Sequence, residues 1–198
     1  MNFDPQPPID IYILPGGSMP KRKSKEAIGY DVCLRAVVSA DKMDKKNPYL
    51  RETLFDFKHI VHPSIKDFVD RRVCGGKKNR ELVYRLEPGK MATCGIGFVT
   101  QIPFPLCYLS LCRSGIASKH HIMVANAPGT IDPDYRGEAV IILYNCGTRS
   151  FYLYRNMRIA QILHTYAIIP RHNRVQRYSD LSKTERGAGG FGSTGFRK

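Results

Sequence analysis

The sequence predicts an all-β protein, and three observations support this prediction. Apolar and polar residues alternate between Tyr30 and Val38, which is the period-two pattern of a half-buried strand. Glycine and proline turn signals recur along the chain, as at Glu87–Gly89 and Pro128–Gly129. Between them lie further strand-like runs, at residues 80–86, 91–101, 106–112, 139–145, 151–154 and 159–169. Short strands divided by tight turns favour a sandwich, a jelly roll or a barrel.

Length and composition indicate one globular domain over residues 1–198. Of these 198 residues, 42% are hydrophobic and 24% are charged, which suits a chain with a single core. The longest wholly apolar run, Ala139–Tyr144, is far below the ~20 residues that cross a bilayer, and no secretory signal pattern is visible. We therefore expect no membrane contact and a cytoplasmic location, or the cytosol of an infected host if the source is viral.

The charged segment 41–78 interrupts the strand pattern, and we interpret it as a small α-containing insertion between two strands. It holds the one segment with helical spacing, which follows Pro63. Ser64 and Asp67 have the spacing of a capping box, so we expect a short helix there. The insertion is expected to pack on the sheet through four apolar side chains, those of Phe55, Phe57, Phe68 and Val69.

Net charge and motif content reduce the number of possible functions. The net charge of +14 favours an anionic partner such as a polyphosphate or a nucleic acid, and it also promotes solubility. The six cysteines form no C-x-x-C pair, so the sequence lacks the spacing of a zinc ribbon or a thioredoxin-like motif. A P-loop, a zinc-deaminase signature and a G-x-S-x-G elbow are also missing from the sequence.

Four features together suit a nucleoside triphosphate. Arg113-Ser114-Gly115 follows a strand and combines a guanidinium, a hydroxyl and exposed backbone N–H groups. The turn from Gly129 to Gly137 carries two carboxylates and an aromatic ring, and Asp31 projects from the first long strand. The glycine-rich arm, residues 179–198, cannot order by its composition alone and would suit a lid that closes over a ligand.

These segments resemble the five motifs of the trimeric-type dUTPase family (deoxyuridine triphosphate nucleotidohydrolases), in order. The five matching segments are Ala27–Asp31, Cys112–Ala117, Asn126–Gly137, Arg158–Ile162 and Arg186–Gly195. Five motifs in order are far more specific than any one of them. The resemblance implies a distorted jelly-roll β-barrel with a C-terminal arm. It also implies hydrolysis of dUTP to dUMP and pyrophosphate, by water attack on the α-phosphorus.

The resemblance also implies a role for each site residue. Asp132 corresponds to the catalytic carboxylate that deprotonates the attacking water. Tyr135 corresponds to the tyrosine under the deoxyribose, and Asn126, with the hairpin backbone at Thr130 and Ile131, to the uracil-reading edge. The phosphates would be held by Arg113, Ser114, Gly115 and Gln161. From the arm, uracil stacking and phosphate contacts would come from Phe191, Arg186, Gly192 and Ser193.

Mg²⁺ and a homotrimer with shared active sites are the cofactor and the partner state that the resemblance implies. Asp31 would reach the ion through water, since Mg²⁺ commonly keeps several waters. Nucleic acid is not the expected partner. Two alternatives remain open: a dCTP deaminase or bifunctional deaminase/dUTPase, and a nucleotide-sensing regulatory protein on the same fold. Deamination is disfavoured because the position of its catalytic glutamate, about Ile142, is apolar.

Two features depart from the family pattern. The fourth motif usually begins with Gly-Asp, where this chain has Asn156-Met157, so the turn before Arg158 needs another explanation. The interval between the first and second motifs is also several dozen residues longer than in compact family members, because of the segment 41–78. We interpret that segment as a decoration of the fold.

Overall fold

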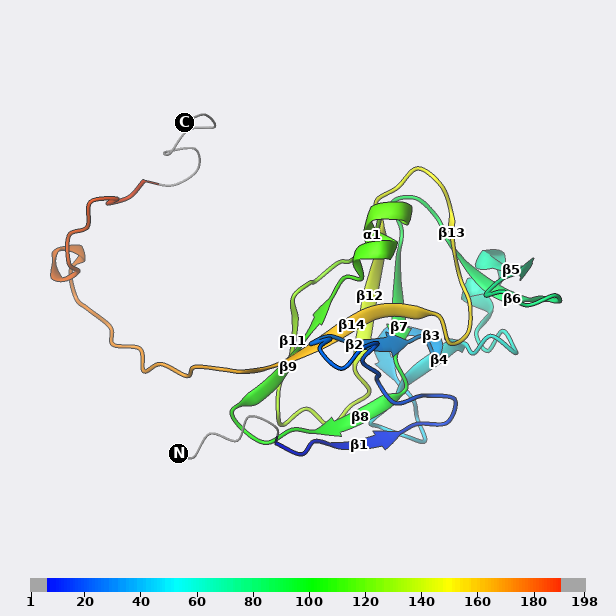
Figure 1. Ribbon diagram of the computed structural model, residues 1–198, viewed down its shortest axis with the longest axis horizontal. Helices are drawn as coiled ribbons and strands as arrows, with labels where there is room; N and C mark the ends of the chain where they lie inside the picture. Colours follow the sequence, from blue (N-terminus) through cyan, green and yellow to red (C-terminus); the bar gives the residue numbers. More distant parts are fainter. Residues whose placement is uncertain (1–6, 190–198) are drawn as a thin grey trace. The chain divides into compact units, whose positions relative to one another are not determined.

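The computed structural model describes residues 7–189 (Figure 1). The chain divides into two compact units, Met1–Ala167 and Ile168–Lys198. The first unit holds the strands and the α-helix α1 (Ser114–His120), and also the 3₁₀ helix η1 (Pro63–Phe68). Its strands are β1 (Asp10–Ile13), β2 (Tyr30–Cys33), β3 (Ala36–Met43), β4 (Arg51–Phe55), β5 (Val69–Val73), β6 (Arg80–Leu86), β7 (Met91–Gly95), β8 (Phe98–Gln101), β9 (Leu106–Leu111), β10 (Ile122–Val124), β11 (Gly129–Ile131), β12 (Val140–Asn145), β13 (Phe151–Leu153) and β14 (Arg158–Tyr166).

These strands form an antiparallel jelly roll, which confirms the predicted fold class. Two larger sheets have the strand orders β10-β12-β7-β3-β4 and β11-β9-β14-β2. Two smaller sheets, β1-β8 and β13-β6-β5, complete the set within the described residues. Figure 1 shows β1 and β8 along one end of the unit, and the β5–β6 pair set apart at its side.

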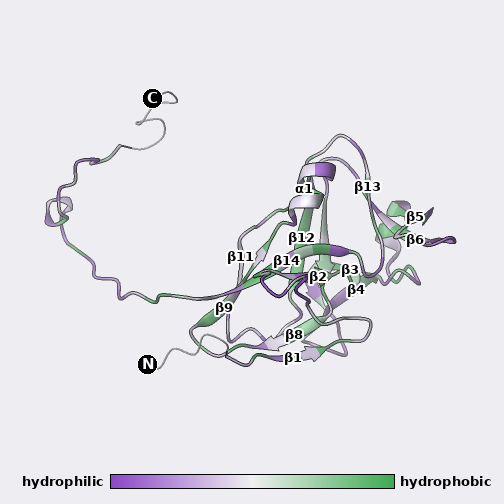
Figure 2. Ribbon diagram, viewed as in Figure 1, coloured by the Kyte–Doolittle hydropathy of each residue, from purple (hydrophilic) through white to green (hydrophobic). Residues whose placement is uncertain are grey.

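The alternating segment that predicted the first strand spans both large sheets. Of the residues expected on its inward side, Val32, Leu34, Ala36 and Val38 are buried, and Tyr30 is half-buried against the core. The strand is divided because the chain changes partners: the N–H of Leu34 donates to the carbonyl of Met157, and the N–H of Arg35 donates to that of Gly95. β2 therefore pairs with β14, whereas β3 pairs with β7. This corner joins the two sheets over one core, and Figure 2 shows apolar residues on the strands around it.

The segment 41–78 differs from the prediction in its helix. It contains β4 and β5, and its helical turn η1 is a 3₁₀ helix that begins at Pro63, so the prediction of an α-helix there is wrong. The cap is also different, because the ring nitrogen of His62 accepts the N–H of Ser64. The α-helix lies in the main unit instead, at Ser114–His120. The packing residues agree with expectation: Phe55 and Phe57 are in the core, and Phe68 and Val69 pack against it.

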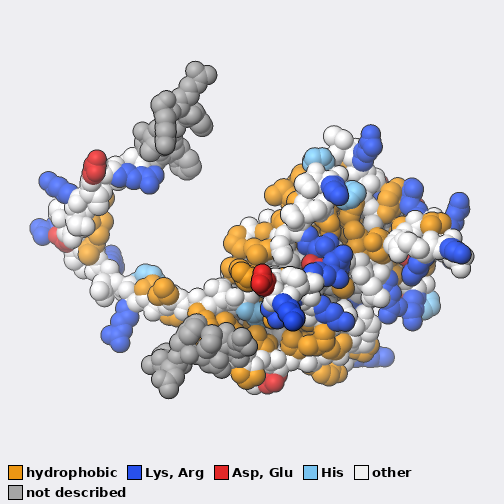
Figure 3. Space-filling view, in the orientation of Figure 1, with side chains coloured by type: hydrophobic (Ala, Val, Ile, Leu, Met, Phe, Trp, Pro, Cys, Tyr) orange, Lys and Arg blue, Asp and Glu red, His pale blue; other side chains and the backbone are white. Residues whose placement is uncertain are grey.

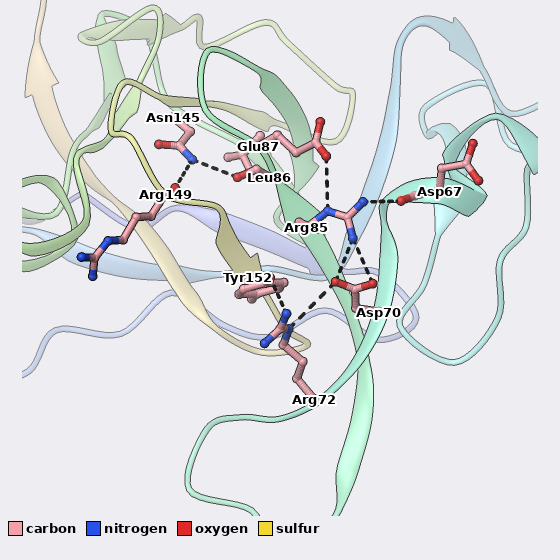
Figure 4. A network of polar contacts seen from close by, with 9 residues as sticks. All are labelled: Asp67, Asp70, Arg72, Arg85, Leu86, Glu87, Asn145, Arg149 and Tyr152. Atoms are coloured by element: carbon pink, nitrogen blue, oxygen red, sulfur yellow. Dashed lines mark hydrogen bonds and ion pairs between the residues drawn. The ribbon is translucent and has the colours of Figure 1, made fainter.

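A network of polar contacts holds the β5–β6 hairpin to its neighbours (Figure 4). Arg85 on β6 is at its centre, with one guanidinium nitrogen 3.0 and 3.1 Å from the two carboxylate oxygens of Asp70. The same guanidinium also contacts Glu87 and donates to the carbonyl of Asp67 in η1. Arg72 lies over the ring of Tyr152 on β13, 3.8 Å from its centroid. The hairpin is thus tied to η1 and to β13 by side chains as well as by backbone.

The second unit, Ile168–Lys198, is described by itself. Its one regular element within the described residues is the 3₁₀ helix η2 (Tyr178–Asp180), where the guanidinium of Arg177 pairs with Asp180 at 3.1 Å. Between residues 168 and 189 its other hydrogen bonds are local, such as the bond from the N–H of Gly187 to the carbonyl of Thr184 at 3.2 Å. The residues from 168 to 188 are exposed. The arm expected over residues 179–198 lies inside this unit.

A buried ion pair connects the corner between the two sheets to the segment after β11. Arg35 donates two hydrogen bonds of 2.7 Å to the carboxylate of Glu138, whose side chain is 0% exposed. The N–H of Gly97 also donates to this carboxylate, at 2.9 Å. Gly95 leaves the space for it, because a Cβ at that position would lie 2.6 Å from a Glu138 oxygen. The charge is therefore fully partnered in the core.

Removal of one partner should strongly destabilise the fold. In Glu138→Ala, the guanidinium of Arg35 loses its counter-charge, so the free energy of unfolding should fall by about 3–5 kcal/mol. The control is Lys77→Ala, which breaks the more exposed pair with Glu81 and should cost no more than about 1 kcal/mol. Urea denaturation at fixed protein concentration measures both. Equal effects of the two substitutions would contradict a structural role for Glu138.

Candidate active site

Asp31 on β2 is the centre of a charged cluster. One of its carboxylate oxygens accepts a hydrogen bond from Nε of Arg113 at 2.9 Å, and the other accepts one from Arg158 at 2.7 Å. Arg113 also donates to the backbone carbonyl of Arg158 at 3.0 Å. The Asp31 side chain is only 13% exposed, whereas that of Arg158 is 41% exposed. The carboxylate is thus fixed in position, and Arg158 still faces solvent.

Gln161 lies beside this cluster because of strand register. It is directly opposite Asp31 in the β14–β2 pair and opposite Leu111 in the β14–β9 pair. Its side-chain amide donates to the carbonyl of Cys112 at 2.9 Å. Gly29 allows this arrangement, since a Cβ there would lie 2.4 Å from the Gln161 amide oxygen. The structure therefore places Gln161 next to the strand that leads to Arg113.

The start of α1 brings the rest of the second motif to the same place. Arg113 follows β9 by two residues and is the N-cap of α1, with extended backbone angles. Its side chain makes no capping hydrogen bond and contacts Asp31 instead. Ser114 and Gly115 follow in the first turn, and both are exposed. A Cβ at Gly115 would meet no atom within 4 Å. Arg113, Ser114 and Gly115 thus form one accessible corner beside Asp31.

The third motif does not form the expected hairpin but an edge strand, β11, and the turn that follows it, because the strand partner of β11 is β9. β11 pairs with β9, and the side chain of Ser110 donates to the carbonyl of Gly129 at 3.3 Å. A Cβ at Gly129 would lie 2.7 Å from the side-chain nitrogen of Asn126, so the glycine makes room for this amide. Asn126 and Thr130 are exposed, and Ile131 is half-buried against the core. The Asn126 amide and the β11 backbone therefore share one open edge of the sheet.

Tyr135 folds back over the turn that follows β11. Its hydroxyl donates to the carbonyl of Glu138 at 3.1 Å, and its N–H donates to the carbonyl of Asp132 at 3.2 Å. Gly137 is required beneath the ring, since a Cβ there would lie 2.4 Å from the tyrosine hydroxyl oxygen. The carboxylate of Asp132 is exposed and lies near Cys107: burial, and then the Asp132 charge, raise the pKa of that thiol. Asp132 is thus open to a ligand or to water.

The two groups of site residues lie at opposite edges of one sheet. In the order β11-β9-β14-β2, Asp31 is on β2, and the third motif is on and after β11. Three strand spacings separate these edges, and the β9 register places Asp132 about four residues further along than Asp31. The offset across the strands and the offset along them are each about 14 Å. Because the two directions are perpendicular, the two carboxylates are roughly 20 Å apart within one chain.

The remaining expected residues lie in the second unit. Arg186 donates from Nε to the carbonyl of Gly189 at 2.8 Å, so its visible contact is local. Phe191, Gly192 and Ser193 lie outside the described residues.

The unusual start of the fourth motif is explained by backbone conformation. Asn156 has φ of 60°, a left-handed conformation that glycine adopts readily and that asparagine tolerates better than most residues. Its N–H donates to the carbonyl of Leu34 at 3.0 Å, and the N–H of Met157 donates to that of Tyr154 at 3.2 Å. The turn is therefore kept, and Met157 packs on the core where the motif usually has an aspartate.

Two residues that hold the site together were not assigned a role from the sequence. Arg158 starts the fourth motif, and its ion pair with Asp31 follows from the β14–β2 pairing, which the strand runs alone do not specify. Glu138 holds the carbonyl that receives Tyr135, yet it looks like an ordinary charged residue after a turn. Its position next to two apolar residues of a strand is the one sequence signal for burial.

Comparisons with known proteins agree with this fold and these motifs. The family model described as dUTPase matches residues 84–195. The deoxyuridine 5′-triphosphate nucleotidohydrolase of Rickettsia akari is 45% identical over 112 residues, which are 56% of this chain and 72% of the relative. The one from Rhizobium etli is 47% identical over 111 residues, 56% of this chain and 69% of the relative. The chain belongs to the dUTPase family.

Solved structures with a similar fold are also dUTPases. The dUTPase of Staphylococcus bacteriophage 80alpha, with dUpNHpp, superimposes with a TM-score of 0.65 at 20% identity, over 96% of this chain and 99% of that chain. The dUTPase from phage phi11 of S. aureus gives a TM-score of 0.58 at 16% identity, over 88% of this chain and 100% of that chain. At this identity the likeness supports the jelly roll. No helix within residues 7–189 is long and apolar enough to span a membrane.

Proposed function

We propose that this protein hydrolyses dUTP to dUMP and pyrophosphate. The observation that carries the proposal is the placement of the family motifs: the sheet presents an arginine–carboxylate cluster at one edge and an exposed aspartate beside a folded-back tyrosine at the other. Phosphoryl transfer needs positioned cations and a placed water more than covalent help from the protein. The chain supplies the cations as arginines beside Asp31, and Asp132 is an exposed carboxylate that can place the water.

The family resemblance assigns a role to each group, and the surroundings of the groups are compatible with these roles. The exposed carboxylate of Asp132 accepts a proton from the water that attacks the α-phosphorus. Arg113, Ser114, Gly115 and Gln161 contact the phosphates from the accessible corner beside Asp31. The Tyr135 ring is held against Gly137 and fixes the floor on which the deoxyribose rests, so that a 2′-hydroxyl has no room. Asn126 and the backbone at Thr130 and Ile131 read the uracil edge.

Deamination fits the structure less well. The position expected for a catalytic glutamate, Ile142, is an apolar residue in the middle of β12. Glu138 is the nearest acidic residue in sequence, and its carboxylate is fully engaged by Arg35 and the N–H of Gly97. Its side chain is also 0% exposed, so it does not face a substrate. Hydrolysis is the function that the residues support best.

The residues present fit Mg²⁺ only through water. Both oxygens of Asp31 accept hydrogen bonds from arginines, and within residues 7–189 no three His, Cys, Asp or Glu side chains gather to hold a metal ion. An oxygen of Asp31 can accept a further hydrogen bond from a metal-bound water, while the triphosphate supplies direct ligands. When bound there, Mg²⁺ neutralises phosphate charge. Asp31 is the carboxylate that anchors its waters.

The separation of the two groups argues for an active site shared between chains. A separation of roughly 20 Å between Asp31 and Asp132 is longer than one phosphate group and its waters can bridge. A second copy that presents its β11 edge to the first copy's Asp31 cluster removes this distance. We propose a homotrimer, the state that the family resemblance implies, closed by rotational symmetry. Each site then takes the Asp31 cluster from one chain and the β11 edge from a neighbour. In this proposal the arm with Arg186 and Phe191 closes the site.

The catalytic base is tested by Asp132→Asn. The amide keeps the shape and loses the proton acceptor, so kcat for dUTP should fall by about 100- to 10,000-fold with little change in the affinity for dUMP. Asp134→Asn is the matched control, because Asp134 is an exposed carboxylate in the same turn. Pyrophosphate release measures turnover, and calorimetry measures binding. Turnover by Asp132→Asn at the rate of the control would rule out the assigned base.

Sharing between chains is tested by mixing two inactive variants. Asp31→Asn and Asp132→Asn should each be nearly inactive alone. Co-refolded at equal amounts, they form trimers in which about a quarter of the sites combine an intact Asp31 with an intact Asp132 of a neighbour, so about that share of activity should return. Mixing without refolding is the control. If both carboxylates acted from the same chain, no activity would return.

The lid is tested by truncation after Tyr178. The shortened chain loses Arg186 and the proposed stacking ring of Phe191, so turnover should fall by about 100-fold or more, as when transition-state charge stabilisation is removed. The thermal midpoint should stay the same, because the strands and core belong to the first unit. Arg174→Ala is the control for loss of one arm charge outside the motif. Full turnover by the truncated chain would exclude a closing arm.

A further inference from the structure

A cavity of about 360 Å³ opens beside Asp31, on the side of the N-terminal segment. Its charged lining consists of Lys21, Lys23, Asp31, Arg155 and Arg158. The volume is at the small end of the range for ligand sites, about 300–1,000 Å³. Figure 3 shows Lys and Arg side chains gathered on the face that carries β2 and β14. Lys21, Lys23 and Arg155 belong to none of the five motifs.

Backbone pairing fixes Lys21 next to Asp31. The two residues form an antiparallel bridge, in which the N–H of Lys21 donates to the carbonyl of Asp31 at 3.1 Å and the reverse bond is 2.9 Å. Directly opposed residues place their side chains on the same face, with Cβ atoms about 5 Å apart. Lys23 is two residues further along the same segment and also lines the cavity.

The cavity has an excess of positive charge. The Asp31 carboxylate is already paired with Arg113 and Arg158. Within residues 7–189, Lys21, Lys23 and Arg155 form no ion pair. Three cations that share one recess repel each other, and an anion bound between them would relieve that repulsion. A multiply charged phosphate ligand matches this lining.

One wall of the cavity is held rigidly by close backbone contacts. The N–H of Leu14 donates to the carbonyl of Gly97 at 3.0 Å, and a Cβ at Gly17 would lie only 1.9 Å from that same carbonyl oxygen. Gly16 has φ of +80°, and a Cβ there would lie 3.1 Å from a guanidinium nitrogen of Arg155. The loop thus lies directly against Arg155, and the wall is in place before a ligand arrives.

We propose that this cavity is the subsite for the two distal phosphates of the nucleotide, and that Lys21, Lys23 and Arg155 hold the departing pyrophosphate. The inference rests on the proposed function. In that reaction the water oxygen bonds to the α-phosphorus, and the bond from this phosphorus to the bridging oxygen breaks. The bridging oxygen keeps the electron pair, and the water proton passes to Asp132. The negative charge that develops on the leaving group is then next to the lysines.

The test is direct binding of pyrophosphate to the full chain by calorimetry, without nucleotide and in EDTA. The double variant Lys21→Gln/Lys23→Gln should weaken pyrophosphate binding by about tenfold, and should weaken a non-hydrolysable dUTP analogue by a similar factor. Its affinity for dUMP should not change, because dUMP has no distal phosphates. Lys25→Gln is the matched control, an exposed lysine of the same segment that does not line the cavity.

The outcomes separate this subsite from the proposed function. Pyrophosphate should compete with the dUTP analogue, and the double variant should remain folded because both lysines are exposed. Unchanged affinity for pyrophosphate in the double variant, or binding that does not compete with the analogue, would overturn the subsite even if dUTP is hydrolysed. Lysine-dependent, competitive binding would support it, and a failure to hydrolyse dUTP would then count against the proposed reaction alone.

Discussion

The buried ion pair between Arg35 and Glu138 is the constraint on which the arrangement of the site depends. Arg35 lies at the corner where the chain leaves β2 and enters β3, and Glu138 follows the turn that carries Asp132 and Tyr135. A charge taken out of water must be fully partnered, and here two guanidinium bonds and one backbone N–H satisfy the carboxylate. Because the Glu138 carbonyl also receives the Tyr135 hydroxyl, the position of the ring follows from the same buried contact.

Much of the fold could be predicted from the sequence, because alternate residues of a half-buried strand are apolar and this period can be recognised. The runs that became β6, β9, β12 and β14 were recognisable in this way. The elements α1, β10 and β11 were not. The two strands have three residues each, too few to show a period, and the seven residues of α1 span only about two helical turns. The helix predicted after Pro63 became a 3₁₀ turn, and the chain from Val69 onward pairs with β6 as strand β5 instead of continuing a helix.

The candidate site could be predicted as a set of residues but not as an arrangement. The five motifs follow one another along the sequence in the order of the family. This order does not indicate that Asp31 and Asp132 lie at opposite edges of a sheet. That separation comes from strand pairing, as does the contact of Arg158 with Asp31. Asn156 stands where the family motif usually has glycine. It preserves the turn because its backbone adopts the left-handed conformation that glycine favours.

The pairing of β2 with β14 and of β3 with β7 also bears on what could be excised from this protein. The stretch that matches the family model, residues 84–195, contains β7, β14 and Glu138 but neither of the two partner strands nor Arg35. Cut out alone, this stretch would expose the unpaired edges of β7 and β14. It would also leave the Glu138 carboxylate among apolar residues without its guanidinium partner. The portion most similar to its relatives is therefore not a minimal folding unit, because it needs β2, Arg35 and β3 from the preceding part of the chain.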